Sequence, residues 1–121
     1  DRPFRCGLVP IGYADGLPRA LSNRGWFAVS GIPCRILGRV CMDQTIISLE
    51  ELPAAKPGDP VVILGRGDDG AMTAWDAAEL SGTIAYEILT SLAARIPRLY
   101  QRGGQIVALA DVSGLAWHPD A

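Results

Sequence analysis

With 121 residues and a formal net charge of −2, the chain fits one domain and lacks the basic excess that nucleic-acid or polybasic membrane binding requires. Apolar residues make up 49% of the sequence, which is enough for a packed core. No apolar stretch reaches membrane-spanning length and no secretory signal opens the chain, so we expect a cytoplasmic protein with no membrane partner. The first residue is Asp1 rather than Met, which predicts a piece of a longer protein.

The cysteine and histidine content argues against a disulfide framework and against a metal site. Cys6, Cys34 and Cys41 are odd in number and widely spaced, which favours reduced thiols. The one histidine, His118, leaves too few ligands for a zinc site, so we expect no metal.

The first three quarters of the chain read as short strands separated by glycine and proline turns. Apolar and β-branched runs predict strands at 6–11, 26–29, 34–37, 44–49 and 60–65. Asp15-Gly16 predicts a tight turn, because glycine accepts a positive φ. A helical turn is predicted at 18–22, closed by 23–25, and further turns at 31–33, 57–59 and 67–70.

The hydrophobic period then becomes helical. Thr73 and Asp76 have the spacing of a capping box at the start of a short helix, and Ser81-Gly82 ends it. Its apolar residues lean to one side, namely Trp75, Ala78 and Leu80.

A second helix is predicted after Thr83, its candidate cap, and Pro97 ends it. Its apolar residues at helical spacing are Ile84, Ala85, Ile88, Leu89 and Leu92. A strand follows at 106–110, and 117–121 reads as a free tail. Together these elements predict a mainly β fold, a barrel or closed sheet with one or two short helices, formed by residues 1–121 as one domain.

Three segments carry residues that could take part in chemistry, and each also has a purely structural interpretation. Gly12–Gly16 displays Tyr13 where a strand ends, or is a hairpin with this Tyr at the edge of the core. Cys41–Gln44 starts a strand, with a backbone N–H that could bind an anion. Tyr86 lies near the positive end of a helix dipole, where phosphates bind, or packs at one end of an amphipathic helix.

The order and spacing of these segments resemble the C-terminal β-domain of alanine racemase. The resemblance rests on Val9–Gly16 (VPIGYADG) and Gly38–Gln44 (GRVCMDQ), followed by Tyr86–Leu89 and Arg95–Arg98. It spans about the whole chain, from near Leu8 to the strand after Gln105. It implies a bacterial, pyridoxal-phosphate (PLP)-dependent isomerase that interconverts L- and D-alanine for cell-wall peptidoglycan.

The resemblance also implies a role for individual residues. Met42 would bind the substrate carboxylate through its backbone N–H, and the neighbouring Asp43 would support that contact. Tyr86 would contact the PLP phosphate through its hydroxyl. The corridor through which substrate reaches the active site would be lined by Tyr13, Arg19, Arg39 and Ile84.

No catalytic residue is assigned within this sequence. In the family a catalytic Tyr lies in a Val-Ser-Tyr-Gly-type motif upstream of the first segment, and the cofactor-binding Lys belongs to an N-terminal TIM barrel. We therefore expect the chain alone to be inactive and to hold no PLP. The partners that the resemblance implies are the N-terminal barrel of the same chain, the second subunit of a homodimer and the substrate alanine, with no nucleic acid.

Two alternatives stay open on the sequence. One is a related PLP enzyme, such as a broader-specificity amino-acid racemase or a serine racemase that shares this domain. The other is a non-enzymatic β-barrel binding domain. A decarboxylase of the same architecture is disfavoured, because Cys41 is followed by Met42-Asp43 rather than by a Cys-Asp-x₂-Asp-type segment.

Overall fold

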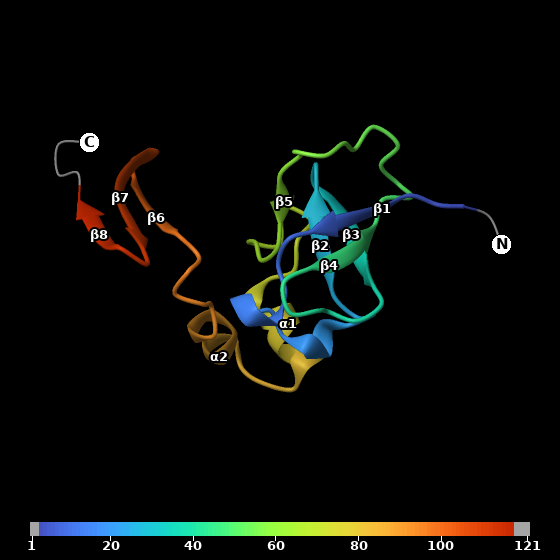
Figure 1. Cartoon of the computed structure of the whole chain (residues 1–121), viewed down its shortest axis with the longest axis horizontal. Helices are drawn as coiled ribbons and strands as arrows, with labels where there is room; N and C mark the ends of the chain where they lie inside the picture. The colour runs from blue at the N-terminus through green and yellow to red at the C-terminus, as the bar shows by residue number, and fades with distance from the viewer. Residues whose placement is uncertain (1–2, 118–121) are drawn as a thin grey trace. The chain divides into compact units, whose positions relative to one another are not determined.

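The computed structural model describes residues 3–117 and divides the chain into two compact units, Asp1–Ser91 and Leu92–Ala121. The first unit is built on an antiparallel sheet in the order β1-β4-β3-β2-β5, which curls into a half-barrel (Figure 1). Its strands are β1 (Cys6–Val9), β2 (Trp26–Val29), β3 (Ile32–Leu37), β4 (Thr45–Ser48) and β5 (Val61–Val62). The mainly β fold predicted from the sequence is confirmed.

The bounds of β1, β3 and β5 differ most from the prediction, whereas β4, predicted at 44–49, is shorter by one residue at each end. Strand β1 ends at Val9 rather than at residue 11, because the Ile11 N–H turns back to the Val9 carbonyl at 2.8 Å. Strand β3 begins at Ile32, since the hairpin loop consists of Ser30-Gly31, both with positive φ. Strand β5 has two residues instead of six, because Pro60 lacks an N–H and the chain beyond β5 leaves the sheet.

Helix α1 (Ala74–Ser81) has the capping box that the sequence predicts. The Thr73 hydroxyl accepts from the Asp76 N–H at 3.1 Å, and the Asp76 carboxylate accepts from the Thr73 N–H at 2.8 Å. Gly82 ends the helix with a φ of 71°. The predicted apolar side is wrong at Trp75, which is exposed, because the small Ala77 and Ala78 pack on the core instead.

Helix α2 (Ala85–Thr90) is shorter than predicted and starts differently. Its N-cap is Ile84, and the Thr83 hydroxyl donates to the Glu87 side chain instead of accepting from the backbone. The helix ends well before Pro97, because the Thr90 and Ser91 hydroxyls both donate to the Glu87 carbonyl. Such side-chain bonds to the backbone compete with further helical turns.

The core of the first unit lies between the sheet and the helices. It is formed by side chains from every layer, including Leu21, Phe27, Ile36, Ile47, Met72 and Ile88. The helices and two single 3₁₀ turns, η1 (Tyr13–Asp15) and η2 (Arg19–Leu21), gather at one end of the sheet (Figure 1). These turns confirm the predicted turns at Asp15-Gly16 and at 18–22.

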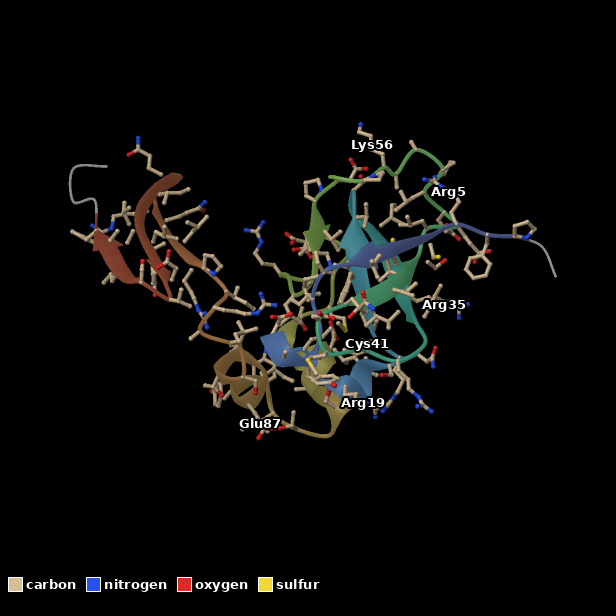
Figure 2. All side chains as sticks on the ribbon, viewed as in Figure 1. Arg5, Arg19, Arg35, Cys41, Lys56 and Glu87 are labelled. Carbon is tan, nitrogen blue, oxygen red and sulfur yellow. The ribbon has the colours of Figure 1, made fainter. Side chains whose placement is uncertain are left out.

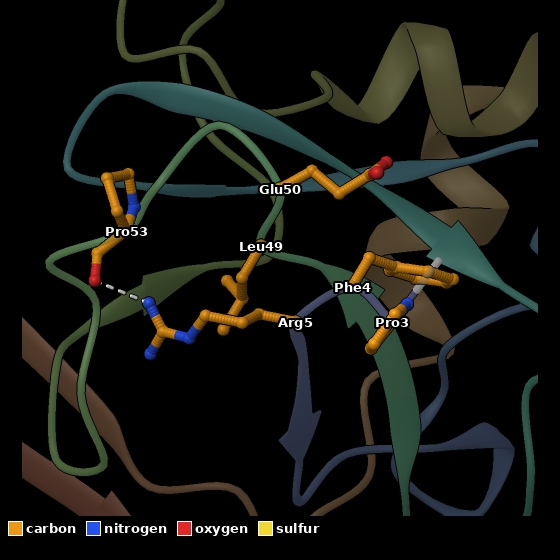
Figure 3. A pocket seen from close by; sticks show the side chains of 6 residues that line it. All are labelled: Pro3, Phe4, Arg5, Leu49, Glu50 and Pro53. Carbon is orange, nitrogen blue, oxygen red and sulfur yellow. Dashed lines mark hydrogen bonds between the residues drawn. The ribbon is translucent and has the colours of Figure 1, made fainter. Parts of the chain in front are cut away.

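Near the start of the chain, Arg5 fixes the loop that follows β4. Its guanidinium donates to the Pro53 carbonyl at 2.6 Å (Figure 3). It also donates to the Leu52 carbonyl at 3.0 Å and to the Ala55 carbonyl. Arg5 therefore has a structural role. No helix among residues 3–117 is long and apolar enough to cross a membrane.

The second unit is a three-stranded antiparallel sheet in the order β6-β7-β8. Its strands are β6 (Arg98–Arg102), β7 (Gln105–Asp111) and β8 (Gly114–Trp117). The sequence predicted only the middle strand. Trp117, assigned to a free tail, belongs to β8, and its ring lies 5.8 Å from the Arg102 guanidinium carbon. The rest of the predicted tail, 118–121, lies outside the described residues and includes His118.

Two well-defined turns join the strands of this sheet, including the two strands that were not predicted from the sequence. Gly103 and Gly104 have φ values of 56° and 80°, as a type I′ hairpin turn requires. At the next turn the Asp111 carboxylate accepts from the Ser113 hydroxyl and, at 2.8 Å, from its N–H. These two bonds hold the pKa of the Asp111 carboxyl below its usual value.

Candidate functional site

The two segments that carry the family resemblance lie side by side. The Tyr13 N–H donates to the Cys41 carbonyl at 2.9 Å, and the Ala14 N–H donates to the Met42 carbonyl at 2.9 Å. The Thr45 hydroxyl adds a third bond, to the Ile11 carbonyl, at 2.7 Å. We call these paired segments, residues 11–16 and 41–45, the loop clamp.

Gly12 is what allows the two backbones of the loop clamp to approach so closely. A Cβ atom at this position would lie 2.1 Å from the Cys41 carbonyl oxygen and 2.5 Å from the Met42 carbonyl carbon. Its φ of −154° suits any residue, so the constraint is space rather than backbone conformation. The buried Asp15 carboxylate accepts from the Gly12 N–H at 3.0 Å and fixes the same turn from within.

The loop clamp presents Tyr13 and Met42 at the surface. Their side chains are 45% and 58% exposed, although the backbone that carries them is tightly bonded. Among residues 3–117, the Met42 N–H has no hydrogen-bond partner. It is therefore a backbone donor on a fixed loop, available to an acceptor that the chain does not supply. Asp43, the next residue, is also exposed.

Ser22 links the two loops that carry Arg19 and Arg39. Its hydroxyl donates to the Arg19 carbonyl at 2.6 Å and accepts from the Val40 N–H at 2.9 Å. Asn23 adds a bond from the Gly38 N–H to its side-chain oxygen at 2.6 Å. Both arginine side chains are exposed, so their positions are set by backbone contacts while their charges face solvent.

A surface hollow of about 500 Å³ brings two of the predicted corridor residues together. Tyr13 and Arg19 lie along it, and α2 with the residues beside it contributes Thr83, Glu87, Ile88 and Ser91. Figure 2 shows Arg19 and Glu87 at the helical end of the first unit, away from Arg5 and Lys56. The other predicted site residues do not line this hollow: Arg39, Met42, Asp43, Ile84 and Tyr86.

The first turn of α2 presents Ile84 and Tyr86, which are 61% and 71% exposed. Ala85 and Ile88, on the other side of the turn, are buried. The helix has only six residues, so its dipole is weaker than the sequence interpretation of Tyr86 assumed. The turn presents the phenol side chain of Tyr86 at the surface.

Most of the predicted site residues offer hydrogen-bond donors or cations, whereas Asp43, and Glu87 along the hollow, are carboxylates. Among residues 3–117, no group of three or more His, Cys, Asp or Glu is placed to hold a metal ion. Cys6, Cys34 and Cys41 are free thiols, and burial raises the pKa of the Cys34 thiol. This arrangement can bind and orient an anion.

Sequence reasoning missed three residues whose contacts shape this part of the fold. Gly12 belongs to a recognised motif, but the sequence did not predict that two backbone segments approach each other closely at this residue. Ser22 was assigned only to a helical turn, and its link to Val40 spans 18 residues, which local patterns do not reveal. Glu87 carried no expected role, although its spacing of four residues from Thr83 is a usable signal for a side-chain pair.

Comparison with known proteins matches residues 1–100 to the family described as alanine racemase, C-terminal domain. Alanine racemase 1 of Clostridium acetobutylicum is 40% identical over 114 residues, which are 89% of this chain and 30% of the relative. Among solved structures, alanine racemase from Bacillus anthracis with bound L-Ala-P has a TM-score of 0.77 at 40% identity, covering 89% of this chain and 27% of that one. Alanine racemase from Bartonella henselae with covalently bound pyridoxal phosphate has a TM-score of 0.64 at 37% identity, covering 73% and 25%.

These matches identify the chain as a β-domain found in larger enzymes, since the chain spans less than a third of the length of each of these relatives. The chain belongs to the alanine racemase family, as its C-terminal domain. The resemblance found in Val9–Gly16 and Gly38–Gln44 is confirmed. The roles of individual site residues stay predictions.

Proposed function

We propose that this chain acts within a PLP-dependent alanine racemase that interconverts L- and D-alanine. Relatives of this domain are named alanine racemase at 40% identity and above, and one solved relative holds L-Ala-P. The observation that carries the proposal is the loop clamp, which joins the two family segments and leaves the Met42 N–H available.

Met42 is proposed to bind the substrate carboxylate through its backbone N–H. A hydrogen bond from a backbone N–H to a carboxylate is charge-assisted, and such bonds contribute about 1.5–3 kcal/mol. The clamp supports this role, because its loop need not reorganise when substrate binds. Asp43 is proposed to support the loop rather than to touch substrate, since its own negative charge would repel a carboxylate.

Tyr13, Arg19, Arg39 and Ile84 are proposed to line the corridor to the active site. The two exposed arginines would attract the alanine carboxylate and raise its local concentration. Tyr13 and Arg19 along one hollow support a shared path. Ile84 would add an apolar wall that favours a small side chain.

Tyr86 is proposed to donate its hydroxyl to the PLP phosphate. The exposed hydroxyl fits one phosphate oxygen, and no partner for it is found within the part of the chain that the structure describes. When bound, PLP withdraws electrons from the substrate α-carbon, which makes its proton removable. One such bond contributes about 1–3 kcal/mol, far below the roughly 8 kcal/mol of micromolar binding. The remaining contacts are proposed to come from the N-terminal barrel and from the second subunit of a homodimer.

Racemisation of L-alanine and L-serine by a complete enzyme carrying this domain tests the proposed function. We expect D-alanine to form with a higher kcat/KM than D-serine, and the 121-residue chain alone to give no turnover. Equal rates on both substrates would favour a broad-specificity racemase, and no racemisation by the complete protein would favour a binding domain. The cytoplasmic location stays a prediction.

A further inference from the structure

Helix α2 begins without the usual N-terminal cap. Its N-cap residue is Ile84, whose side chain cannot accept a hydrogen bond, and no side-chain cap is present. A helix of six residues is marginal on its own, because few backbone bonds offset the cost of its first turn. Something other than helix propensity must fix this turn.

A side-chain bond spans the turn instead. The Thr83 hydroxyl donates to the Glu87 carboxylate at 2.8 Å, and this bond spans the segment that contains Ile84 and Tyr86. The backbone of Thr83 is itself held by the end of α1, since its N–H donates to the Ala78 carbonyl at 3.0 Å. Through Thr83, the bond therefore connects the end of α1 to the middle of α2.

Glu87 also ties the far end of α2. Its carbonyl accepts from the Ser91 N–H at 3.0 Å and from the Ser91 hydroxyl at 2.7 Å. Because Tyr86 is mostly exposed, few packing contacts restrain its side chain. The position from which the Tyr86 side chain extends is then set by the backbone of this turn, and that backbone is held by the buried Ala85 and Ile88 and by the Thr83–Glu87 bond.

We propose that Thr83 and Glu87 form a positioning pair, which aims the Tyr86 hydroxyl at the phosphate of the cofactor. This proposal rests on the proposed function of Tyr86 as a phosphate contact. Neither residue of the pair touches the cofactor. The pair acts by holding the backbone from which the Tyr86 side chain extends, so that less backbone order has to be gained when the phosphate binds.

The test is a double-mutant cycle on PLP affinity in a complete racemase that carries this domain. Thr83→Val keeps the shape of the side chain and removes only the hydroxyl. We expect it to raise the PLP dissociation constant by about twofold to tenfold, as the loss of one hydrogen bond would. Tyr86→Phe should produce a loss at least as large, and Thr83→Val should add little to it, because the pair acts through Tyr86. Thr83→Ser keeps a hydroxyl and should restore most of the affinity.

The outcomes separate this proposal from the proposed function. If Tyr86→Phe leaves the PLP dissociation constant unchanged, the phosphate role of Tyr86 is wrong. If Tyr86→Phe weakens binding and Thr83→Val weakens it equally in both backgrounds, the phosphate role stands and the positioning pair is wrong. Failure of Thr83→Ser to restore affinity also overturns the pair. Melting of each PLP-free variant shows whether any change in affinity reflects loss of the fold.

Discussion

The loop clamp and the first turn of α2 both present predicted site residues, but different kinds of contact hold them. In the loop clamp, the bonds at Tyr13 and Ala14 join backbone to backbone, and Gly12 allows the two backbone segments to come into contact. In the turn of α2, one bond between the side chains of Thr83 and Glu87 spans the segment. Backbone bonds survive most substitutions, whereas a side-chain pair is lost with either partner.

This difference indicates how the two parts of the site can vary. The loop clamp fixes a backbone N–H, so the identity of the Met42 side chain has little influence on what the loop offers. The turn of α2 offers a side-chain hydroxyl, so its contribution depends on Tyr86 and on the pair that aims it. We therefore expect the position of the Met42 N–H to depend mainly on backbone contacts, and the contribution of the α2 turn to depend on its side chains.

The largest effect is expected from Gly12→Ala, which places a methyl group against the Cys41 carbonyl. Overpacking against backbone should lower the free energy of unfolding by about 3 kcal/mol or more, a large share of a typical domain's stability. Gly38→Ala is the matched control. Its Cβ meets nothing within 4 Å, but its φ of 75° is strained for alanine, at about 1–2 kcal/mol. Urea unfolding of the complete protein measures both, and equal losses would contradict the clamp.

An intermediate effect is expected from Arg39→Ala, which leaves the clamp intact and removes a charge beside it. At low ionic strength we expect kcat/KM for alanine to fall by roughly threefold to tenfold, and its dependence on salt to become weaker. Arg35→Ala removes an exposed charge from β3 and serves as the control. A loss of the same size for both variants, or an unchanged salt dependence, would argue against steering by Arg39.

The smallest effect is expected from Met42→Leu. The two side chains have similar volume, and the proposed contact is made by the backbone. We expect kcat/KM for alanine to stay within about twofold of the wild-type value, measured by racemisation of L-alanine by the complete enzyme. A loss of activity would show that the Met42 side chain, and not only its N–H, contacts the substrate.

Local sequence patterns predicted the parts of the fold that depend on neighbouring residues. Strand β2 was placed at its observed bounds, and the capping box of Thr73 and Asp76 started α1 as expected. The Gly103-Gly104 turn carried a usable signal for the second sheet that was not applied. Contacts between distant segments could not be predicted in this way. The approach of Gly12 to Cys41 and the bond from Ser22 to Val40 depend on how the sheet and the turns pack.

The central claim, that the loop clamp binds substrate through a backbone N–H, is tested most directly by removing that N–H. Incorporation of the α-hydroxy analogue of methionine at position 42 of the complete enzyme replaces the amide by an ester. It also weakens the Cys41 carbonyl as an acceptor from Tyr13. The same replacement at Asp43 is the control, because it weakens the Met42 carbonyl in the equivalent bond and keeps the Met42 N–H. We predict that KM for alanine rises by about tenfold or more for the ester at Met42 and by less than about threefold for the ester at Asp43. Equal changes in KM at both positions, or none at Met42, would contradict the claim.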